Sequence, residues 1–133
     1  MGAAAVRLPS VLLWIALAAF TTGAQAQPLL DGTWKATFAT EGSEGREATV
    51  TIDGLTGSWT THARSTKDKK DVCVGRPLPM TLLDSGSSTV TLRVDASTVV
   101  QGCRDRKARL TRVDARTLEG EFDNGRVLRL VRD

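Results

Sequence analysis

The residues with the clearest potential for chemistry are the two cysteines, Cys73 and Cys103, and the single histidine, His62. Two thiols can form a disulfide, work as a redox pair or contribute to a metal site. A redox pair typically has the Cys-x-x-Cys spacing, which these cysteines lack. A structural zinc site needs four ligands, more than two cysteines and one histidine supply. We therefore predict a Cys73–Cys103 disulfide, no metal and no cofactor.

The pattern of titratable residues does not favour catalysis. His62 falls on the polar side of a predicted strand, and its place in the sequence defines no Ser-His-Asp arrangement. The aspartates stand singly at predicted turns, where their side chains bond nearby backbone amides. Motifs for a phosphate loop, a nucleophile elbow or a zinc protease are absent from the sequence. We predict no catalytic residue; the alternative, a small enzyme, would depend on His62.

Basic residues are concentrated in one late segment of the chain: Arg104, Arg106, Lys107, Arg109 and Arg112. One interpretation is a surface for an anionic partner such as lipopolysaccharide, a polyanion or an acidic protein. The other is an ordinary solvated strand face. A nucleic-acid partner is not expected, because aromatic residues do not interleave with these charges.

The first residues predict export. Arg7 precedes an apolar run over residues 11–20, and Ala24-Gln25-Ala26 has the small-x-small pattern of a signal peptidase site. The apolar run is about half as long as the ~20 residues that a membrane-spanning helix needs. We predict a cleaved signal peptide over 1–26 and a mature domain over 27–133, in the periplasm or secreted, with no membrane span. Such compartments are oxidising, which favours the disulfide.

The predicted mature chain is short. Its 107 residues are enough for one domain, and 17 basic against 15 acidic residues give it a net charge of +2. A domain of this size buries only about two-thirds of its unfolded surface. A disulfide closing the loop from Cys73 to Cys103 would add about 3–4 kcal/mol of stability.

Apolar and polar residues alternate with a period of two along most of this domain, as in strands with one buried face. The first predicted strand covers 31–40, with Trp34, Ala36 and Phe38 on one face. A polar turn over 41–45 follows it.

Asp53-Gly54 is a strong signal for a two-residue hairpin turn. The turn predicts three apolar pairs between its strands: Ile52 with Leu55, Val50 with Gly57 and Ala48 with Trp59. All six residues would then share the buried face of the sheet.

The middle of the chain mixes clear and ambiguous segments. Residues 64–71 are all polar or charged, so we expect an exposed loop. Pro77 and Pro79 cannot donate to a ladder, so the strand over 78–83 is expected to begin at an edge or bulge. A strand over 89–94 follows.

Residues 95–105 fit two alternatives, a helical turn capped by Asp95 or a short strand over 98–100. The next predicted strand covers 107–113. For the last hairpin, a three-residue loop over 123–125 keeps apolar residues opposite one another, whereas a two-residue turn opposes them to glutamates. We prefer the longer loop, which pairs Leu118 with Leu130, Gly120 with Leu128 and Glu119 with Arg129.

These segments amount to about eight short strands with brief connections. A flat sheet would leave two exposed edges, and closure into a barrel removes them. We predict an all-β fold, a single antiparallel meander closed into an approximately eight-stranded barrel with one disulfide. Trp34 and Trp59 lie on the predicted inner face, where they would either plug the barrel or line one end of a ligand cavity.

Two motifs carry resemblances to known families. The Gly32-x-Trp34 opening and the stretch Thr56-Gly57-Ser58-Trp59-Thr60-Thr61 resemble avidin-like barrels. The same opening, one disulfide and the closing strand over 127–132 are similar to bacterial inhibitors of secreted metalloproteases. The first resemblance implies a ligand-binding barrel, although avidin's later tryptophans have no counterparts after Trp59. The second implies that the N-terminal segment 27–30 would enter a protease cleft.

We therefore expect an exported, non-catalytic binding protein for a small ligand or an envelope component, using the barrel mouth. The alternative is a protein-binding module such as an inhibitor of a secreted protease, with contacts from loop 64–71 or the N-terminal tail.

Overall fold

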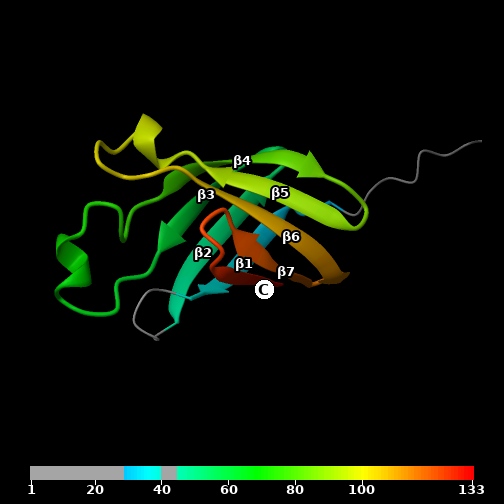
Figure 1. Cartoon of the computed structure of the whole chain (residues 1–133), viewed down its shortest axis with the longest axis horizontal. Coiled ribbons are helices and arrows are strands. Elements are labelled where there is room, and N and C mark those ends of the chain that lie inside the picture. Colours follow the sequence, from blue (N-terminus) through cyan, green and yellow to red (C-terminus); the bar gives the residue numbers. More distant parts are fainter. Residues whose placement is uncertain (1–28, 40–44) are drawn as a thin grey trace, which may run out of the picture.

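The computed structural model describes residues 29–39 and 45–133 of the chain. These residues form a closed barrel of antiparallel strands in sequential order, in which the last strand returns to pair with the first (Figure 1). The strands are β1 (Gly32–Phe38), β2 (Arg46–Asp53), β3 (Thr56–Thr61), β4 (Leu78–Ser85), β5 (Thr89–Val94), β6 (Arg106–Asp114), β7 (Thr117–Phe122) and β8 (Val127–Arg132). The predicted all-β, eight-stranded barrel is confirmed.

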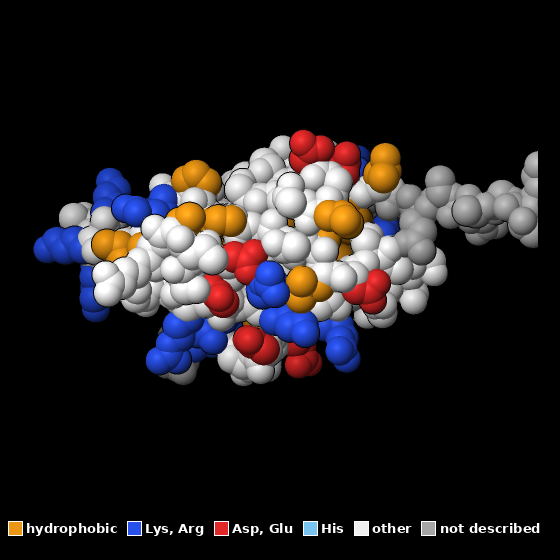
Figure 2. All heavy atoms as spheres, turned by 90° about the horizontal axis from the view of Figure 1, so that it is seen from above, with side chains coloured by type: hydrophobic (Ala, Val, Ile, Leu, Met, Phe, Trp, Pro, Cys, Tyr) orange, Lys and Arg blue, Asp and Glu red, His pale blue; other side chains and the backbone are white. Residues whose placement is uncertain are grey.

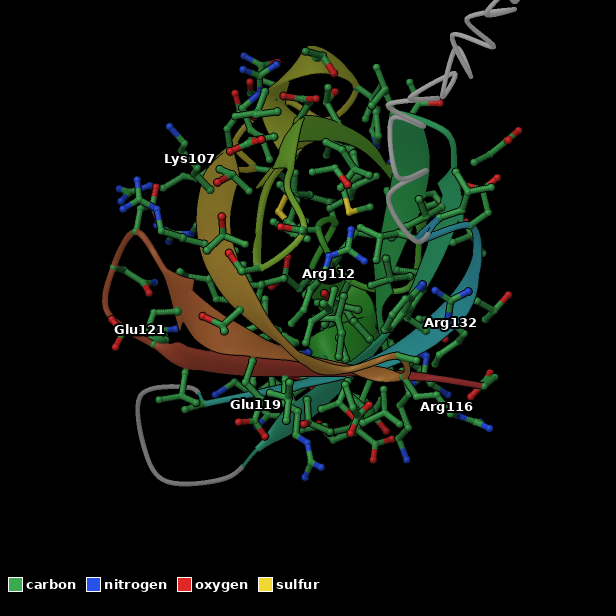
Figure 3. The ribbon with its side chains drawn as sticks, turned by 90° about the vertical axis from the view of Figure 1, so that its right-hand side faces the viewer. Lys107, Arg112, Arg116, Glu119, Glu121 and Arg132 are labelled. Atoms are coloured by element: carbon green, nitrogen blue, oxygen red, sulfur yellow. A yellow bond between two sulfur atoms is a disulfide. The ribbon has the colours of Figure 1, made fainter. Side chains whose placement is uncertain are left out.

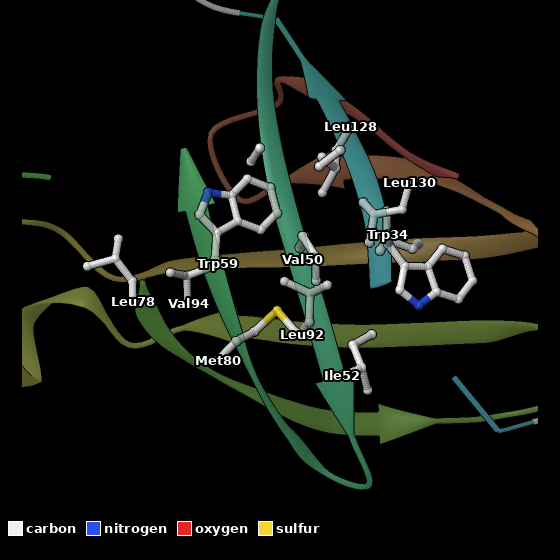
Figure 4. Packing of buried hydrophobic residues seen from close by; sticks show 14 of the residues in the cluster. Trp34, Val50, Ile52, Trp59, Leu78, Met80, Leu92, Val94, Leu128 and Leu130 are labelled. Atoms are coloured by element: carbon white, nitrogen blue, oxygen red, sulfur yellow. The ribbon is translucent and has the colours of Figure 1, made fainter. Parts of the chain in front are cut away.

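Closure follows from the period-two pattern. Every strand turns alternate side chains inward, and the inner residues of the middle layer are inaccessible to solvent, among them Val50, Leu92, Leu110, Leu128 and Leu130. Figure 4 shows several of these packed between two tryptophans. Because β1 and β8 pair with each other, neither strand presents a free edge.

Two inner glycines allow the strands to approach closely. A Cβ atom on Gly57 would lie 2.1 Å from the Thr51 carbonyl oxygen, and one on Gly120 would lie 1.9 Å from the Arg109 carbonyl oxygen. These positions are therefore filled by neighbouring backbone.

The predicted register of the last hairpin is confirmed. Leu118 pairs with Leu130 and Gly120 with Leu128, and on the outer face Glu119 pairs with Arg129. The Arg129 Nε atom lies 3.3 Å from the Glu119 carboxylate. Apolar burial on one face and charge pairing on the other select the same register.

The predicted register of the first hairpin is wrong by two residues. Val50 pairs with Trp59 and Ile52 with Gly57, so the two-residue turn is Gly54-Leu55. Leu55 is 66% exposed. Gly54 has a φ of +65°, a conformation that glycine adopts at little cost and that suits the first position of such a turn. The other residues still point inward as predicted, because a register shift of two residues leaves each side chain on the same face of the sheet.

The expected edge or bulge at the start of β4 is also wrong. Pro79 lies within the β3–β4 ladder opposite Ser58, and in a closed barrel the strand has a neighbour on each side. The Pro79 carbonyl accepts a hydrogen bond from the Asp95 amide at 2.7 Å. The bulge of this strand lies further on, between Leu82 and Asp84.

Of the two alternatives for 95–105, the helical turn is the correct one. A 3₁₀ turn, η2 (Ala96–Thr98), follows Asp95. The Asp95 side chain does not cap it, because its carboxylate accepts hydrogen bonds from Thr81 and Arg93. Asp105 supplies the acceptor instead, with Oδ1 2.9 Å from the Ser97 amide.

The charged loop over 64–71 is largely exposed, as predicted, and contains the short 3₁₀ turn η1 (Asp68–Lys70). The predicted signal peptide over 1–26 and most of the predicted turn over 41–45 lie outside the described residues. No helical segment in the described part of the chain has the length and apolar character needed to cross a membrane.

Candidate ligand-binding site

A cavity of about 380 Å³ lies at one end of the barrel, which we call the open end. It is formed where β1, β3, β5 and β7 finish and the other strands begin. Strands β1 to β7 each contribute inward residues at this end, and Arg126 lies just before β8. The strand residues are Phe38, Arg46, Trp59, Thr61, Leu78, Val94, Arg106 and Phe122. The alternation that fills the middle of the barrel therefore also sets the lining of the cavity.

Three aromatic rings form one side of the cavity. The ring centroids of Phe38 and Trp59 are 5.6 Å apart, those of Phe38 and Phe122 are 5.9 Å apart, and those of Trp59 and Phe122 are 5.7 Å apart. The indole N–H of Trp59 donates to Thr61 Oγ1 at 2.9 Å. Because its polar atom is satisfied within the protein, Trp59 offers the cavity an apolar ring surface.

The disulfide forms another side. Cys73 and Cys103 are bonded, with their Cα atoms 5.7 Å apart, so the predicted pairing is confirmed. Both cysteines line the cavity, together with neighbouring Val74 and Gly102. The bond thus holds together two loops that project beyond the strands (Figure 1).

The remaining lining is mostly cationic. Arg46, Arg104, Arg106 and Arg126 face the cavity, and the only carboxylate among its lining residues is that of Asp71. Asp71 Oδ1 already accepts a hydrogen bond from the Cys73 amide at 2.9 Å. The described lining therefore has four guanidinium groups against one partly engaged carboxylate.

Arg46 is largely buried, with its side chain 13% exposed. One terminal nitrogen lies 3.3 Å from Asp68 Oδ2 and 3.4 Å from the His62 carbonyl oxygen. Its Nε atom is buried and has no hydrogen-bond partner among the described residues. The Arg64 backbone N–H, with further help from its side chain, holds the pKa of Asp68 below the ordinary value. Asp68 therefore stays ionised beside Arg46.

The opposite end, which we call the plugged end, is filled. Trp34 is 1% exposed, and its indole N–H donates to the Leu30 carbonyl at 2.8 Å. The Arg132 guanidinium lies 4.5 Å from the Trp34 ring centroid and donates to the carbonyls of Leu29 and Asp31. Segment 29–31 thus closes this end of the barrel.

The structure separates the two tryptophans singled out by the sequence. Trp59 lines the cavity, whereas Trp34 lies at the far side of the buried cluster (Figure 4). They pair with the same β2 residue, Val50, but the tilt of the strands places them at different levels. Trp34 therefore belongs to the plug, and Trp59 is the tryptophan that a ligand in the cavity would contact.

The basic segment is divided in the same way. Arg104 and Arg106 line the cavity, whereas Lys107 and Arg109 face outward, with Arg109 opposite Glu121. Figure 3, which looks onto the plugged end, shows Lys107 and Glu121 on the outside of the barrel. Arg112 donates to Gly86 O at 2.9 Å and to Ser85 Oγ. These five residues do not form one continuous surface.

Charge is unevenly distributed over the molecule. Figure 2 shows Lys and Arg side chains gathered at its left-hand end, the end of the long loops, while acidic and basic side chains alternate near the middle. On the outer face of β6, β7 and β8, Arg109 lies opposite Glu121 and Arg129 opposite Glu119, so these charges offset one another. On the face shown in Figure 2, basic side chains gather at the open end.

Sequence reasoning missed Arg46 and Arg126 as site residues. Both continue the inward alternation of their strands past the last apolar residue, Arg46 before Ala48 and Arg126 before Leu128. An arginine at an inward position of a strand end is the signal that could have identified them.

His62 lies on the exposed outer face, with Nε2 2.6 Å from Thr49 Oγ1 and Nδ1 3.9 Å from the Glu47 carboxylate. It does not line the cavity. Among the described residues, no group of His, Cys, Asp and Glu is placed to hold a metal ion.

The sequence matches no family model, and no curated protein is significantly similar to it. Among solved structures, a redesigned β-barrel superposes with a TM-score of 0.50 at 16% identity, covering 78% of this chain and 91% of the other. A second redesigned β-barrel, mFAP1 bound to DFHBI, gives a TM-score of 0.47 at 14% identity, covering 78% and 94%. The first similarity supports the small-barrel fold and nothing more specific.

Proposed function

We propose that this protein is a non-catalytic binding protein that holds one small molecule in the cavity at the open end. The observation that carries the proposal is the cavity of about 380 Å³ beside three clustered aromatic rings. Small-molecule sites typically occupy about 300–1,000 Å³ and combine apolar walls with a few polar groups. Eight-stranded barrels are wide enough either to be filled or to hold one small ligand.

The site has the means to bind but no evident means to catalyse. Its titratable groups are arginines and one aspartate, and the histidine lies elsewhere. We further propose that the protein acts in the periplasm or outside the cell. The signal-like residues 1–26 and the disulfide support this location.

Tryptophan fluorescence tests the proposal, because the two barrel tryptophans lie at different ends. In a Trp14→Phe, Trp34→Phe chain, Trp59 is the only reporter, and a bound compound should quench or shift its emission. The matched control is Trp14→Phe, Trp59→Phe, in which Trp34 reports from the plug and should not respond. A broad compound library, with biotin included because of the avidin-like motifs, serves as the ligand source. If no compound affects Trp59, or if both variants respond equally, the proposal is wrong.

A second candidate is a protein-binding module such as an inhibitor of a secreted protease. It is favoured by the exposed basic loop over 64–71 and by the exposed Leu29 at the plugged end. Lys67→Gln, Lys69→Gln, Lys70→Gln tests the loop, and deletion of 27–29 tests the tail, in pull-downs from culture supernatant. Loss of one specific protein with either variant, together with an unresponsive Trp59, would favour this candidate over the first.

A further inference from the structure

We infer that the ligand of the open-end cavity is an organic oxyanion, a molecule with an apolar ring-containing body and one carboxylate, sulfonate or similar group. This inference rests on the proposed function and adds the chemical class of the ligand. It follows from three features of the cavity: the charge of its lining, the lack of internal acceptors for two of its four arginines, Arg104 and Arg106, and the position of the aromatic rings.

The charge of the lining is unusual for the inside of a small barrel. Arg46 and Arg106 occupy inward positions at the starts of β2 and β6, and Arg126 immediately precedes β8. The inward residues two positions further along are Ala48, Ala108 and Leu128. Inward positions in a barrel of this size are normally apolar, and a local break of pattern marks a functional or strained site. Planar guanidinium groups match the two oxygens of a carboxylate or sulfonate.

Internal contacts do not account for all these arginines. The side chains of Arg104 and Arg106 have no hydrogen-bond acceptor or ion-pair partner among residues 29–39 and 45–133. Arg46 at the open end and Arg132 at the plugged end each keep a buried Nε atom without a partner in the same part of the chain, so this feature alone does not distinguish the two ends. Arg104 is exposed and Arg106 is half-buried, so water can serve as their acceptor when the cavity is empty. An oxyanion in the cavity would provide a charged acceptor instead.

The plugged end provides an internal comparison. Arg132 is also an inward arginine at a strand end, and it donates to the carbonyls of Leu29 and Asp31. Arginine there serves to hold the chain across the barrel. At the open end, Arg104 and Arg106 make no such bonds, so structural bracing does not explain them.

The aromatic rings indicate how the ligand would lie. Trp59 and Phe122 are buried, at 4% and 8% exposure, whereas Arg104 belongs to the exposed loop at the rim. An apolar body would therefore contact the rings, and the oxyanion would remain nearer the rim, among the arginines. A neutral molecule of the same shape would gain only the first of these contacts.

Two fluorescent probes with the same ring system test the inference: 8-anilinonaphthalene-1-sulfonate and its uncharged counterpart N-phenyl-1-naphthylamine. We expect the purified chain to bind the sulfonate at least about tenfold more tightly, as a charge-assisted hydrogen bond would give. Arg104→Gln, Arg106→Gln should weaken sulfonate binding about tenfold or more while changing neutral-probe binding little. The neutral probe also reports whether this variant retains the cavity.

The matched control is Lys107→Gln, Arg109→Gln, which removes the same charge from adjacent positions on the outer face. It should leave sulfonate binding nearly unchanged, since these side chains do not line the cavity. An equal loss in both double variants would mean that only the overall charge matters and would overturn the inference.

Other outcomes separate the inference from the proposed function. Equal affinity for the two probes would overturn the oxyanion inference while leaving a small-molecule site. Binding of neither probe, with no Trp59 response to any compound, would overturn both. Displacement of the sulfonate by inorganic phosphate at equal concentration would show a site for bare anions, which would also contradict an organic ligand.

Discussion

The two ends of the barrel are built from the same kinds of residue and yet differ in what those residues contact. Both ends have a buried tryptophan and inward arginines. At the plugged end Arg132 lies over Trp34 and donates to backbone carbonyls of segment 29–31. At the open end Arg106 faces a cavity beside Trp59. The function of an arginine at a strand end therefore depends on whether a chain segment crosses in front of it.

The difference between the ends originates in the connections. Segment 29–31 crosses the plugged end, and its Asp31 carboxylate accepts a hydrogen bond from the Gly54 amide on the far hairpin. At the open end the connections include the two long loops joined by the disulfide, which project outward and form a wall of the cavity. Strand alternation is the same at both ends, so the loops decide which end is filled.

The largest expected effect comes from the plug. Trp34→Ala should lower the free energy of unfolding by about 3–5 kcal/mol, as removal of a fully packed aromatic side chain does. Trp59→Ala should cost clearly less, because one side of the Trp59 ring faces the cavity and has fewer packing partners to lose. Urea unfolding of both variants measures the difference. An equal or larger loss at Trp59 would mean that the two ends are packed alike.

A smaller effect is expected at the arginines. Arg132→Gln should destabilise the protein by about 1–3 kcal/mol, because two hydrogen bonds to carbonyls and the contact with the Trp34 ring are lost. Arg106→Gln should change stability by no more than about 0.5 kcal/mol, since its side chain braces nothing. Thermal unfolding of the two variants compares them directly. A destabilised Arg106→Gln protein would show that the open-end arginines are structural.

The smallest expected effect is on the pH dependence of thermal stability. The Ser97 backbone N–H lowers the pKa of Asp105. Because the folded pKa lies below the unfolded one, this contribution is complete above the unfolded value and is lost as the pH falls through the folded value. The melting temperatures of the native protein and Asp105→Asn should differ at neutral pH and converge in strong acid. A constant difference across that range would show that the charge of Asp105 is not involved.

The strands were predictable because burial on one face imposes a pattern on every strand, and the disulfide because only one pairing was possible. The last hairpin could even be aligned, since Glu119 and Arg129 agree with the apolar pairs. The first hairpin was misplaced because Asp53-Gly54 was read as the turn itself. Gly54 takes a positive φ as the first residue of the turn, and its partner in the turn is the exposed Leu55.

The cavity was not predictable in the same way, because it depends on contacts between distant loops. The sequence places Arg106 next to Lys107, which suggests one basic surface, but their side chains point inward and outward respectively. Arg46 and Arg126 are far from that segment in the chain and join it only when the barrel closes. Whether an inward residue at a strand end lines a cavity depends on the loops that cover that end of the barrel.

The first and last residues that the structure describes, Leu29 and Asp133, both lie at the plugged end of the barrel. Leu29 is bound through Arg132, and the Asp133 amide donates to the Thr33 carbonyl at 3.0 Å. A tether attached after Asp133 would thus leave from the side remote from the arginine-lined mouth. Immobilising the protein through that residue should keep the mouth directed toward the surrounding solution, ready to receive a molecule that diffuses past.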